Sequence, residues 1–178
     1  MDPSFGADAI LRACSLRGVR LTEILLTHIH ADHIATLPEL RRATGARVWV
    51  HPSEVARVPG ALPLPPEGPL SALPGVQTVF TPGHTPGGTC YRFRGDLFTG
   101  DLLFVDWVGR SDFPGGDSRG LFDSLAKLRA LDPDLVIRPG HHYGSVESRR
   151  LGDEVRLNKF FACEDYDRFL ALLPELSE

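Results

Sequence analysis

A cluster of three histidines and one aspartate, set directly after an apolar run, restricts the fold of this chain more than any other feature. His28, His30, Asp32 and His33 stand within the stretch LLTHIHADHIA, residues 25–35. Imidazoles and a carboxylate crowded this closely compete for hydration and repel one another when charged. A bound metal ion would offset that cost. The cluster therefore predicts a fold that places a metal site at the end of a buried strand.

Three further segments repeat the pattern of a strand that runs into a loop opening with histidine or aspartate. His84 lies in the turn TPGHTPGG, Asp101 follows DLFTG, and His141 and His142 follow DLVIRPG. Because the ends of neighbouring strands meet at one rim of a sheet, where α/β folds build their sites, we expect all four loops to converge. Six of the seven histidines lie in these loops, and we expect the seventh, His51, to be structural.

The spacing within these loops suits two metal ions. Residues 28 and 30 of an extended segment point the same way, so two imidazoles can reach one ion. Asp32 and His33, which enter the next predicted helix, can turn toward a second ion. Two adjacent divalent ions need a shared anionic ligand to offset their repulsion, and a carboxylate such as Asp101 can bridge them.

Strand and helix patterns alternate along the chain but also form hairpins, which indicates an α/β fold with mixed sheets. Glycine stops and apolar periodicity predict helices at 6–18, 34–45, 118–132 and 164–173. Strands are predicted at 22–27, 46–52, 76–82, 89–95, 96–100 and 134–140. The proline- and glycine-rich segment 59–74 is predicted to be a loop. In the last helix, the side chains expected to pack on the domain are Tyr166, Phe169, Leu170 and Leu173.

Composition limits the partners that the chain can have. The 178 residues carry a net charge of −4 and contain no Lys/Arg run, which argues against nucleic acid or an anionic membrane as the main partner. No apolar stretch approaches the roughly 20 residues of a membrane span. The start, MDPSFGADAI, is acidic and has no signal-peptide core. We therefore expect one cytoplasmic domain over residues 1–178, without repeats, that acts on a small molecule.

The motifs THIHADH, TPGHTPGG, FTGD and PGH resemble, in this order, the metal-ligand motifs of the metallo-β-lactamase superfamily. Within it, the chain is similar to the glyoxalase II branch and to the persulfide dioxygenases. The resemblance implies an αββα sandwich of two mixed β-sheets flanked by helices, with metal at one edge. Relatives usually have two or more strands before the Asp-Pro that stands here at Asp2–Pro3, so we expect one short sheet. Its edge would be covered by the 59–74 loop, by the N-terminal helix or by a second copy in a homo-oligomer.

The same resemblance assigns ligands residue by residue. One ion would be bound by His28, His30 and His84, and the second by Asp32, His33 and His141, with Asp101 between them. His142 competes for the last position, but the family pattern places the ligand directly after Pro-Gly, which favours His141. Arg110 and Tyr143 match positions at which relatives contact a thiol-bearing substrate.

The function implied by the resemblance is metal-dependent hydrolysis of a small thioester of the hydroxyacylglutathione type. Two divalent ions, expected to be zinc, would generate the attacking hydroxide, with Asp32 and Asp101 as the catalytic carboxylates. The C-terminal helical extension that helps to hold glutathione in long glyoxalase II enzymes has no counterpart in this sequence, which argues against strict glutathione specificity.

Two alternatives stay open from the sequence. His28, His84 and Asp101 alone form the two-histidine, one-carboxylate triad of non-haem Fe(II) oxygenases, which would suit a mononuclear persulfide dioxygenase. The other alternative is a domain that binds metal without catalysing a reaction. Metal content separates the two-zinc hydrolase from the mononuclear iron dioxygenase, and turnover tests the domain that only binds metal.

Overall fold

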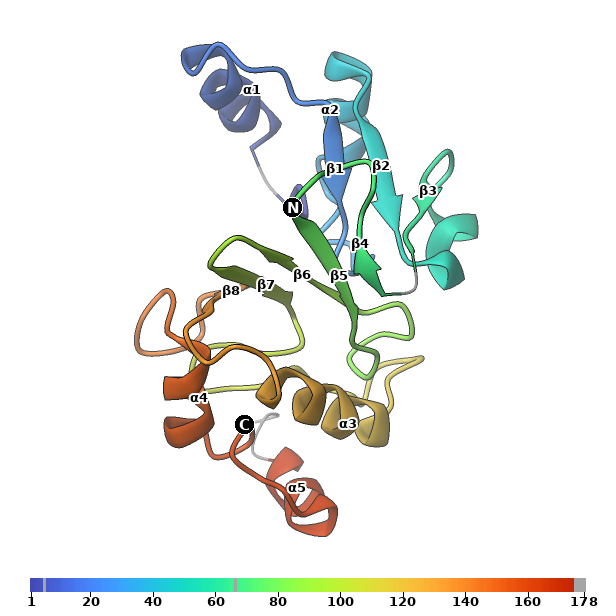
Figure 1. Cartoon of the computed structure of the whole chain (residues 1–178). Coiled ribbons are helices and arrows are strands. Elements are labelled where there is room, and N and C mark those ends of the chain that lie inside the picture. Colours follow the sequence, from blue (N-terminus) through green and yellow to red (C-terminus); the bar gives the residue numbers. More distant parts are fainter. Residues whose placement is uncertain (5, 66, 175–178) are drawn as a thin grey trace.

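Two β-sheets lie face to face between two layers of helices (Figure 1). The computed structural model describes residues 1–4, 6–65 and 67–174. The first sheet has three strands, all parallel, in the order β1 (Glu23–Leu25), β2 (Arg47–Val50) and β3 (Leu62–Pro63). The second sheet is mixed and has the order β4 (Gly68–Pro69), β5 (Val76–Phe80), β6 (Thr89–Phe93), β7 (Asp96–Gly100) and β8 (Val136–Pro139).

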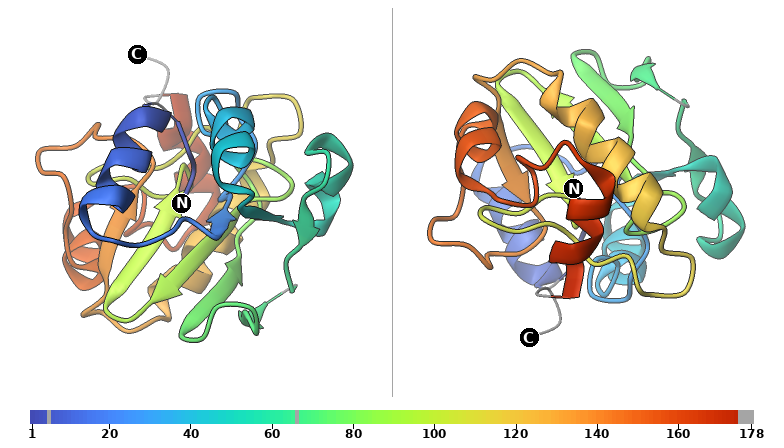
Figure 2. Two further views of the ribbon diagram at one scale, coloured as in Figure 1. Left: turned by 90° about the horizontal axis from the view of Figure 1, so that it is seen from above. Right: turned by 90° about the horizontal axis from the view of Figure 1, so that it is seen from below.

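Helices cover the outer face of each sheet, as the views from above and below show (Figure 2). The three-stranded sheet is covered by α1 (Ala7–Leu16) and α2 (Leu37–Thr44). The five-stranded sheet is covered by α3 (Ser118–Arg129), α4 (Leu151–Leu157) and α5 (Tyr166–Leu172). A short 3-10 helix, η1 (Pro52–Arg57), follows β2. The predicted αββα sandwich is confirmed.

The alternation of side chains along each strand explains the layers. Consecutive strand residues point to opposite faces of a sheet. In β6, Cys90 packs toward the helices while Tyr91 packs between the sheets, and Leu97 and Phe98 divide in the same way in β7. In β2, Trp49 faces the other sheet. β6 and β7 therefore carry apolar side chains on both faces, as the inner sheets of a four-layer sandwich require.

Most predicted elements appear where the local signals place them. Gly18 and Gly45 follow α1 and α2 with positive φ values of 62° and 68°, a conformation that glycine adopts without strain. In α5, Phe169 is fully buried, but Leu170 is exposed, so its predicted packing was wrong. The reason is geometric, because successive helix residues are turned by about 100° and Leu170 lies off the buried face. Within the described part of the chain, no helix is long and apolar enough to cross a membrane.

Four elements were not anticipated from the sequence. The segment 59–74, predicted to be a loop, contributes β3 and β4, which pair with β2 and β5 and so extend both sheets. β3 and β4 thus form the outermost strands on one side of the two sheets, and β1 and β8 form the opposite edges. The helices η1 and α4 are only six and seven residues long, too short for a clear apolar period.

Strand directions bring the four loops of the predicted site to one rim. Because β5 and β7 are both antiparallel to β6, and β8 is parallel to β7, the strands β5, β7 and β8 end at the same edge. The end of β1 is tied to this edge by a hydrogen bond from the Thr89 amide to the Thr27 carbonyl, 2.9 Å long. The predicted convergence of the loops follows from this topology.

Candidate metal centre

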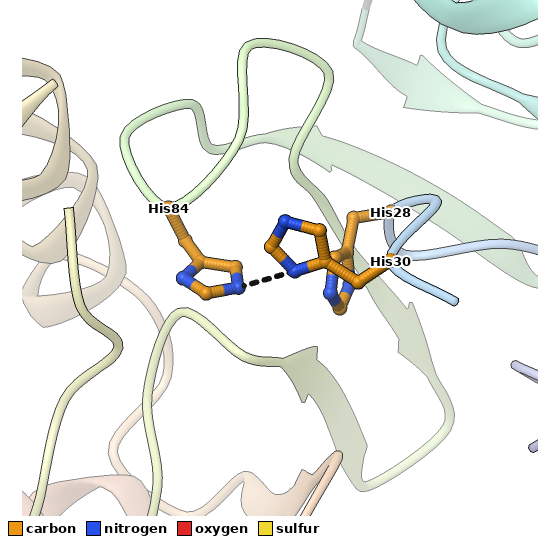
Figure 3. Close-up of side chains that lie close together, drawn as sticks. All are labelled: His28, His30 and His84. Atoms are coloured by element: carbon orange, nitrogen blue, oxygen red, sulfur yellow. Dashed lines mark hydrogen bonds between the residues drawn. The ribbon is translucent and has the colours of Figure 1, made fainter. Parts of the chain in front are cut away.

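Three histidines from two loops form the first cluster of donor atoms at the rim. Ring nitrogens of His28, His30 and His84 lie within 4.8 Å of one another. The rings converge, and His84 Nε2 lies 3.0 Å from His30 Nδ1 (Figure 3). His28 Nε2 is buried and has no hydrogen-bond partner among the described residues. A buried nitrogen left without a partner is costly, and a metal ion would satisfy it.

A second cluster, Asp32, His33 and His141, lies beside the first. The Nε2 atoms of His33 and His141 are 3.1 Å apart, and His141 Nε2 is also 3.1 Å from Asp32 Oδ2. Two imidazole nitrogens at this distance must share either a proton or a cation, because their lone pairs otherwise repel. His142, the competing candidate, is exposed and belongs to none of the donor clusters found in the described residues.

Asp101 lies between the two clusters. Its Oδ1 atom is 3.2 Å from His33 Nε2, and its Oδ2 atom is 3.4 Å from His141 Nε2 and 3.9 Å from His84 Nε2. Oδ1 is buried without a hydrogen bond from the described residues. One carboxylate thus reaches members of both clusters, which is the position of a bridging ligand.

Burial and neighbouring carboxylates set the charges of these imidazoles. Burial lowers the pKa of His28 and of His84, which keeps both rings in the neutral form that metals bind. Burial also opposes protonation of His33, but the carboxylates of Asp101 and Asp2 beside its two ring nitrogens raise the pKa of this ring to about 10. The negative charge around His33 therefore attracts a cation, and a metal ion would compete with a proton for it.

Asp2 contacts the second cluster, which the sequence reasoning missed. Its Oδ1 accepts a hydrogen bond from the Thr27 amide at 2.7 Å, and its Oδ2 accepts one from the Thr27 hydroxyl at 2.6 Å. The same Oδ2 lies 3.2 Å from His33 Nδ1. Carboxylates that hold the far nitrogen of a ligating histidine orient the ring and raise its basicity. The Asp-Pro pair was noticed in the sequence, but nothing local pointed its carboxylate at a histidine 31 positions away.

A backbone carbonyl orients the ring of His84 in the same way, because the Nδ1 atom of His84 lies 2.7 Å from the carbonyl oxygen of Arg110. A proton on Nδ1 would donate to this carbonyl and leave Nε2 free to face the donor clusters. His51, expected to be structural, stacks on Phe80 with ring centroids 4.3 Å apart and accepts a hydrogen bond from the Ser53 amide at the start of η1.

A cavity of about 550 Å³ opens over the donor atoms. Its lining includes both residues predicted to contact substrate, Arg110 and Tyr143. The rest of the lining outside the donor clusters is apolar, with Phe104, Trp107, Val108, Gly109 and Phe113. Concave sites with an apolar lining and a few polar groups are typical of small-molecule binding.

The sequence matches a family model described as the metallo-beta-lactamase superfamily over residues 1–141. Among curated proteins, hydroxyacylglutathione hydrolase GloC of Haemophilus influenzae is 32% identical, with 90% of this chain and 85% of that protein covered. A hydroxyacylglutathione hydrolase of Fuscovulum blasticum is 40% identical over 77% of this chain, which spans only 54% of that protein. The probable polyketide biosynthesis zinc-dependent hydrolase BaeB of Bacillus velezensis is 29% identical over 96% of this chain and 78% of its own length.

Solved structures share the fold of this chain. The crystal structure of ETHE1 from Myxococcus xanthus superimposes with a TM-score of 0.82 and 29% identity, covering 96% of this chain and 76% of that one. The protein TTHA1623, solved in a di-iron-bound form, has a TM-score of 0.79 and 33% identity, with 89% of this chain and 87% of that chain covered.

Proposed function

The chain belongs to the metallo-β-lactamase superfamily, and we propose that it is a metal-dependent hydrolase of small thioesters, the class of substrate to which hydroxyacylglutathione belongs. The observation that carries the proposal is the pair of donor clusters at one rim, with Asp101 between them and a cavity above. The names of the two related hydroxyacylglutathione hydrolases support a thioester substrate. The name of the related zinc-dependent hydrolase supports zinc.

The donor atoms fit a pair of divalent ions. Imidazole nitrogens and carboxylate oxygens are the ligands of catalytic zinc, and the unpartnered nitrogen of His28 and oxygen of Asp101 are both buried at the site. His28, His30 and His84 would hold one ion, and Asp32, His33 and His141 the other, with Asp101 shared. When bound, such ions lower the pKa of a water molecule from about 15.7 to about 7 and polarise a carbonyl oxygen.

The chain's own residues orient the reactants. Asp2 and the Arg110 carbonyl fix the orientation of the His33 and His84 rings, so the Nε2 atoms of both rings already face the donor clusters before substrate binds. The Asp32 side chain is 46% exposed and lines the cavity, where its carboxylate can also accept a hydrogen bond from the attacking water and orient it. The leaving thiolate needs no strong acid, because a thiol has a pKa near 8.5.

Metal content and turnover test this proposal together. Protein purified without added metal should contain close to two zinc ions per chain. It should hydrolyse lactoylglutathione, and the free thiol released would measure this reaction. His33→Ala should lose metal and turnover, because this ring belongs to the second cluster and contacts Asp101. Protein that binds two zinc ions but hydrolyses none of a panel of thioesters would contradict the hydrolase proposal and favour a domain that only binds metal.

A mononuclear iron persulfide dioxygenase is the second candidate. It is favoured by the likeness to ETHE1 over nearly the whole chain and by the nearness of His28, His84 and Asp101 to one another. In such an enzyme Asp32, His33 and His141 would surround the iron without binding it. One iron per chain that survives His33→Ala, together with oxygen uptake that depends on a persulfide, would replace the thioesterase proposal with this one.

A further inference from the structure

The cavity over the donor clusters has an aromatic lining, which we define as Phe104, Trp107, Phe113 and Tyr143. This lining flanks the donors on both sides. Next to the first cluster, the Phe113 ring lies edge-on to His30 and His84, at centroid distances of 5.6 and 5.8 Å. Next to the second cluster, the Tyr143 ring stacks on His141 at 5.0 Å and also contacts Phe104. A reacting carbon held at the donors would therefore have aromatic surface on either side.

The part of the cavity lining outside the donor clusters carries little net charge. Outside the donor clusters, Arg110 is the one charged side chain among the described residues that line it. Its Nε and Nη2 atoms donate to the two carboxylate oxygens of Asp112, at 2.9 and 2.6 Å, and its guanidinium lies 4.7 Å from the centre of the Phe113 ring. A bidentate pair of this kind occupies two of the five guanidinium donors and offsets the charge of Arg110.

This balance bears on which thiol the cavity can recognise. A glutathione half would bring two carboxylates and one ammonium group. The lining described above offers those carboxylates no cation that lacks a counter-ion of its own. Burying a charge without a partner is costly, whereas burying an apolar group against aromatic rings is favourable.

We propose that this site selects thioesters with apolar, uncharged groups on both sides of the sulfur, such as aryl or branched alkyl groups, over thioesters of a charged peptide thiol. The inference rests on the proposed thioester hydrolysis and names the substrate class of that same site. The aromatic lining contributes the affinity for the apolar groups. Arg110 is already paired with Asp112, so it offers no free positive charge to the carboxylates of a peptide thiol.

Binding of non-hydrolysable thioethers to the zinc-loaded protein tests the inference without any turnover. Calorimetric titration would compare S-benzylglutathione, S-methylglutathione and S-benzyl-N-acetylcysteamine. The benzyl group should improve the Kd of the glutathione ligand by about tenfold or more, which equals about 1.4 kcal/mol. Replacing glutathione by the uncharged thiol should tighten binding by about threefold or more, which equals about 0.65 kcal/mol or more. Equal affinity for the benzyl and methyl ligands, or loss of binding without the glutathione charges, would overturn the inference.

A pair of matched variants tests whether the aromatic lining is where the benzyl group binds. Phe113 and Leu170 are both 38% exposed, but only Phe113 lines the cavity, whereas Leu170 lies on α5. Phe113→Ser should weaken S-benzyl ligands by about fivefold, close to 1 kcal/mol, and Leu170→Ser should leave their Kd unchanged. Equal Kd values for both variants and the wild type would contradict a role for the aromatic lining.

The charge argument has its own variant. Asp112→Asn removes the counter-ion of Arg110, and it should tighten glutathione ligands by about two- to fivefold relative to the N-acetylcysteamine ligand, as expected for an exposed ion pair. No relative change would show that Asp112 does not mask Arg110, and the charge argument would fail.

Hydrolysis assays separate this inference from the function on which it rests. The ratio of kcat/KM for phenylacetyl-N-acetylcysteamine to that for lactoylglutathione should exceed about tenfold. A ratio below one, with both compounds hydrolysed, would leave the thioesterase proposal intact and overturn the selectivity. If neither is hydrolysed although the benzyl ligands bind as expected, the proposed function fails and the preference of the cavity for apolar groups stands.

Discussion

Gly140 offers a sharp test of the metal centre, because a single methyl group there would collide with the shared carboxylate. The residue joins the end of β8 to His141, and its amide donates to the Gly100 carbonyl at 2.8 Å. A Cβ atom at this position would lie 2.2 Å from Asp101 Oδ1 and 2.7 Å from His33 Cε1, where real contacts stay beyond 3.0 Å. The φ of Gly140 is not in the left-handed region, so alanine would act through this collision.

The collision is large on the scale of metal coordination. To reach 3.0 Å from the new methyl group, Asp101 Oδ1 must move away by about 0.8 Å. Ligand atoms in metal sites stay within about 0.2 Å of their ordinary bond lengths, so the carboxylate would move by about four times this tolerance. Gly140→Ala should therefore weaken metal affinity by at least about 10–100-fold. The overpacking should also cost roughly 1–3 kcal/mol in the free energy of unfolding of the metal-free protein.

Metal content per chain after dialysis and urea denaturation without metal measure the two effects. Gly95→Ala is the matched control, because a Cβ there meets nothing within 4 Å and the residue has no positive φ. The control should bind metal like the wild type. If Gly140→Ala also keeps the metal content and affinity of the wild type, Asp101 is not the shared ligand, and the reasoning from the geometry of this rim is refuted.

Three other substitutions each test one hydrogen-bonded side chain. Asp2→Asn should weaken metal binding by about 10–100-fold in a chelator competition, because it alters the support of one imidazole, and unchanged affinity would dismiss that role. Hydrogen bonding from Arg149 lowers the pKa of Asp106 from 3.8 to about 2, so its stabilising effect is present above pH 4 and disappears as the pH falls through 2. The difference in unfolding free energy between wild type and Asp106→Asn in urea should shrink over that range, and a constant difference would contradict this. Tyr91→Phe should cost about 1–3 kcal/mol in urea denaturation, because the buried Tyr91 hydroxyl donates to the Leu26 carbonyl at 2.6 Å across the two sheets; a loss below about 0.5 kcal/mol would argue against that bond.

The four loops and the layered α/β fold were predictable because their signals are local. Short apolar runs mark strands such as β1, glycine stops mark the ends of α1 and α2, and the clustered histidines follow an apolar run directly. Each of His28, His84 and Asp101 follows the end of a predicted strand, and their nearness follows once these strand ends share one rim.

The tertiary structure decided everything that depends on residues far apart in sequence. It brought Asp2 to His33, 31 positions away, and it placed Arg110, paired with its neighbour Asp112, at the wall of the cavity. It also recruited the 59–74 segment into both sheets. None of these choices leaves a periodic or compositional trace, because each depends on the direction of one side chain after distant segments have packed. A sequence pattern records which face a residue belongs to, whereas its contact partner is determined only when the layers close.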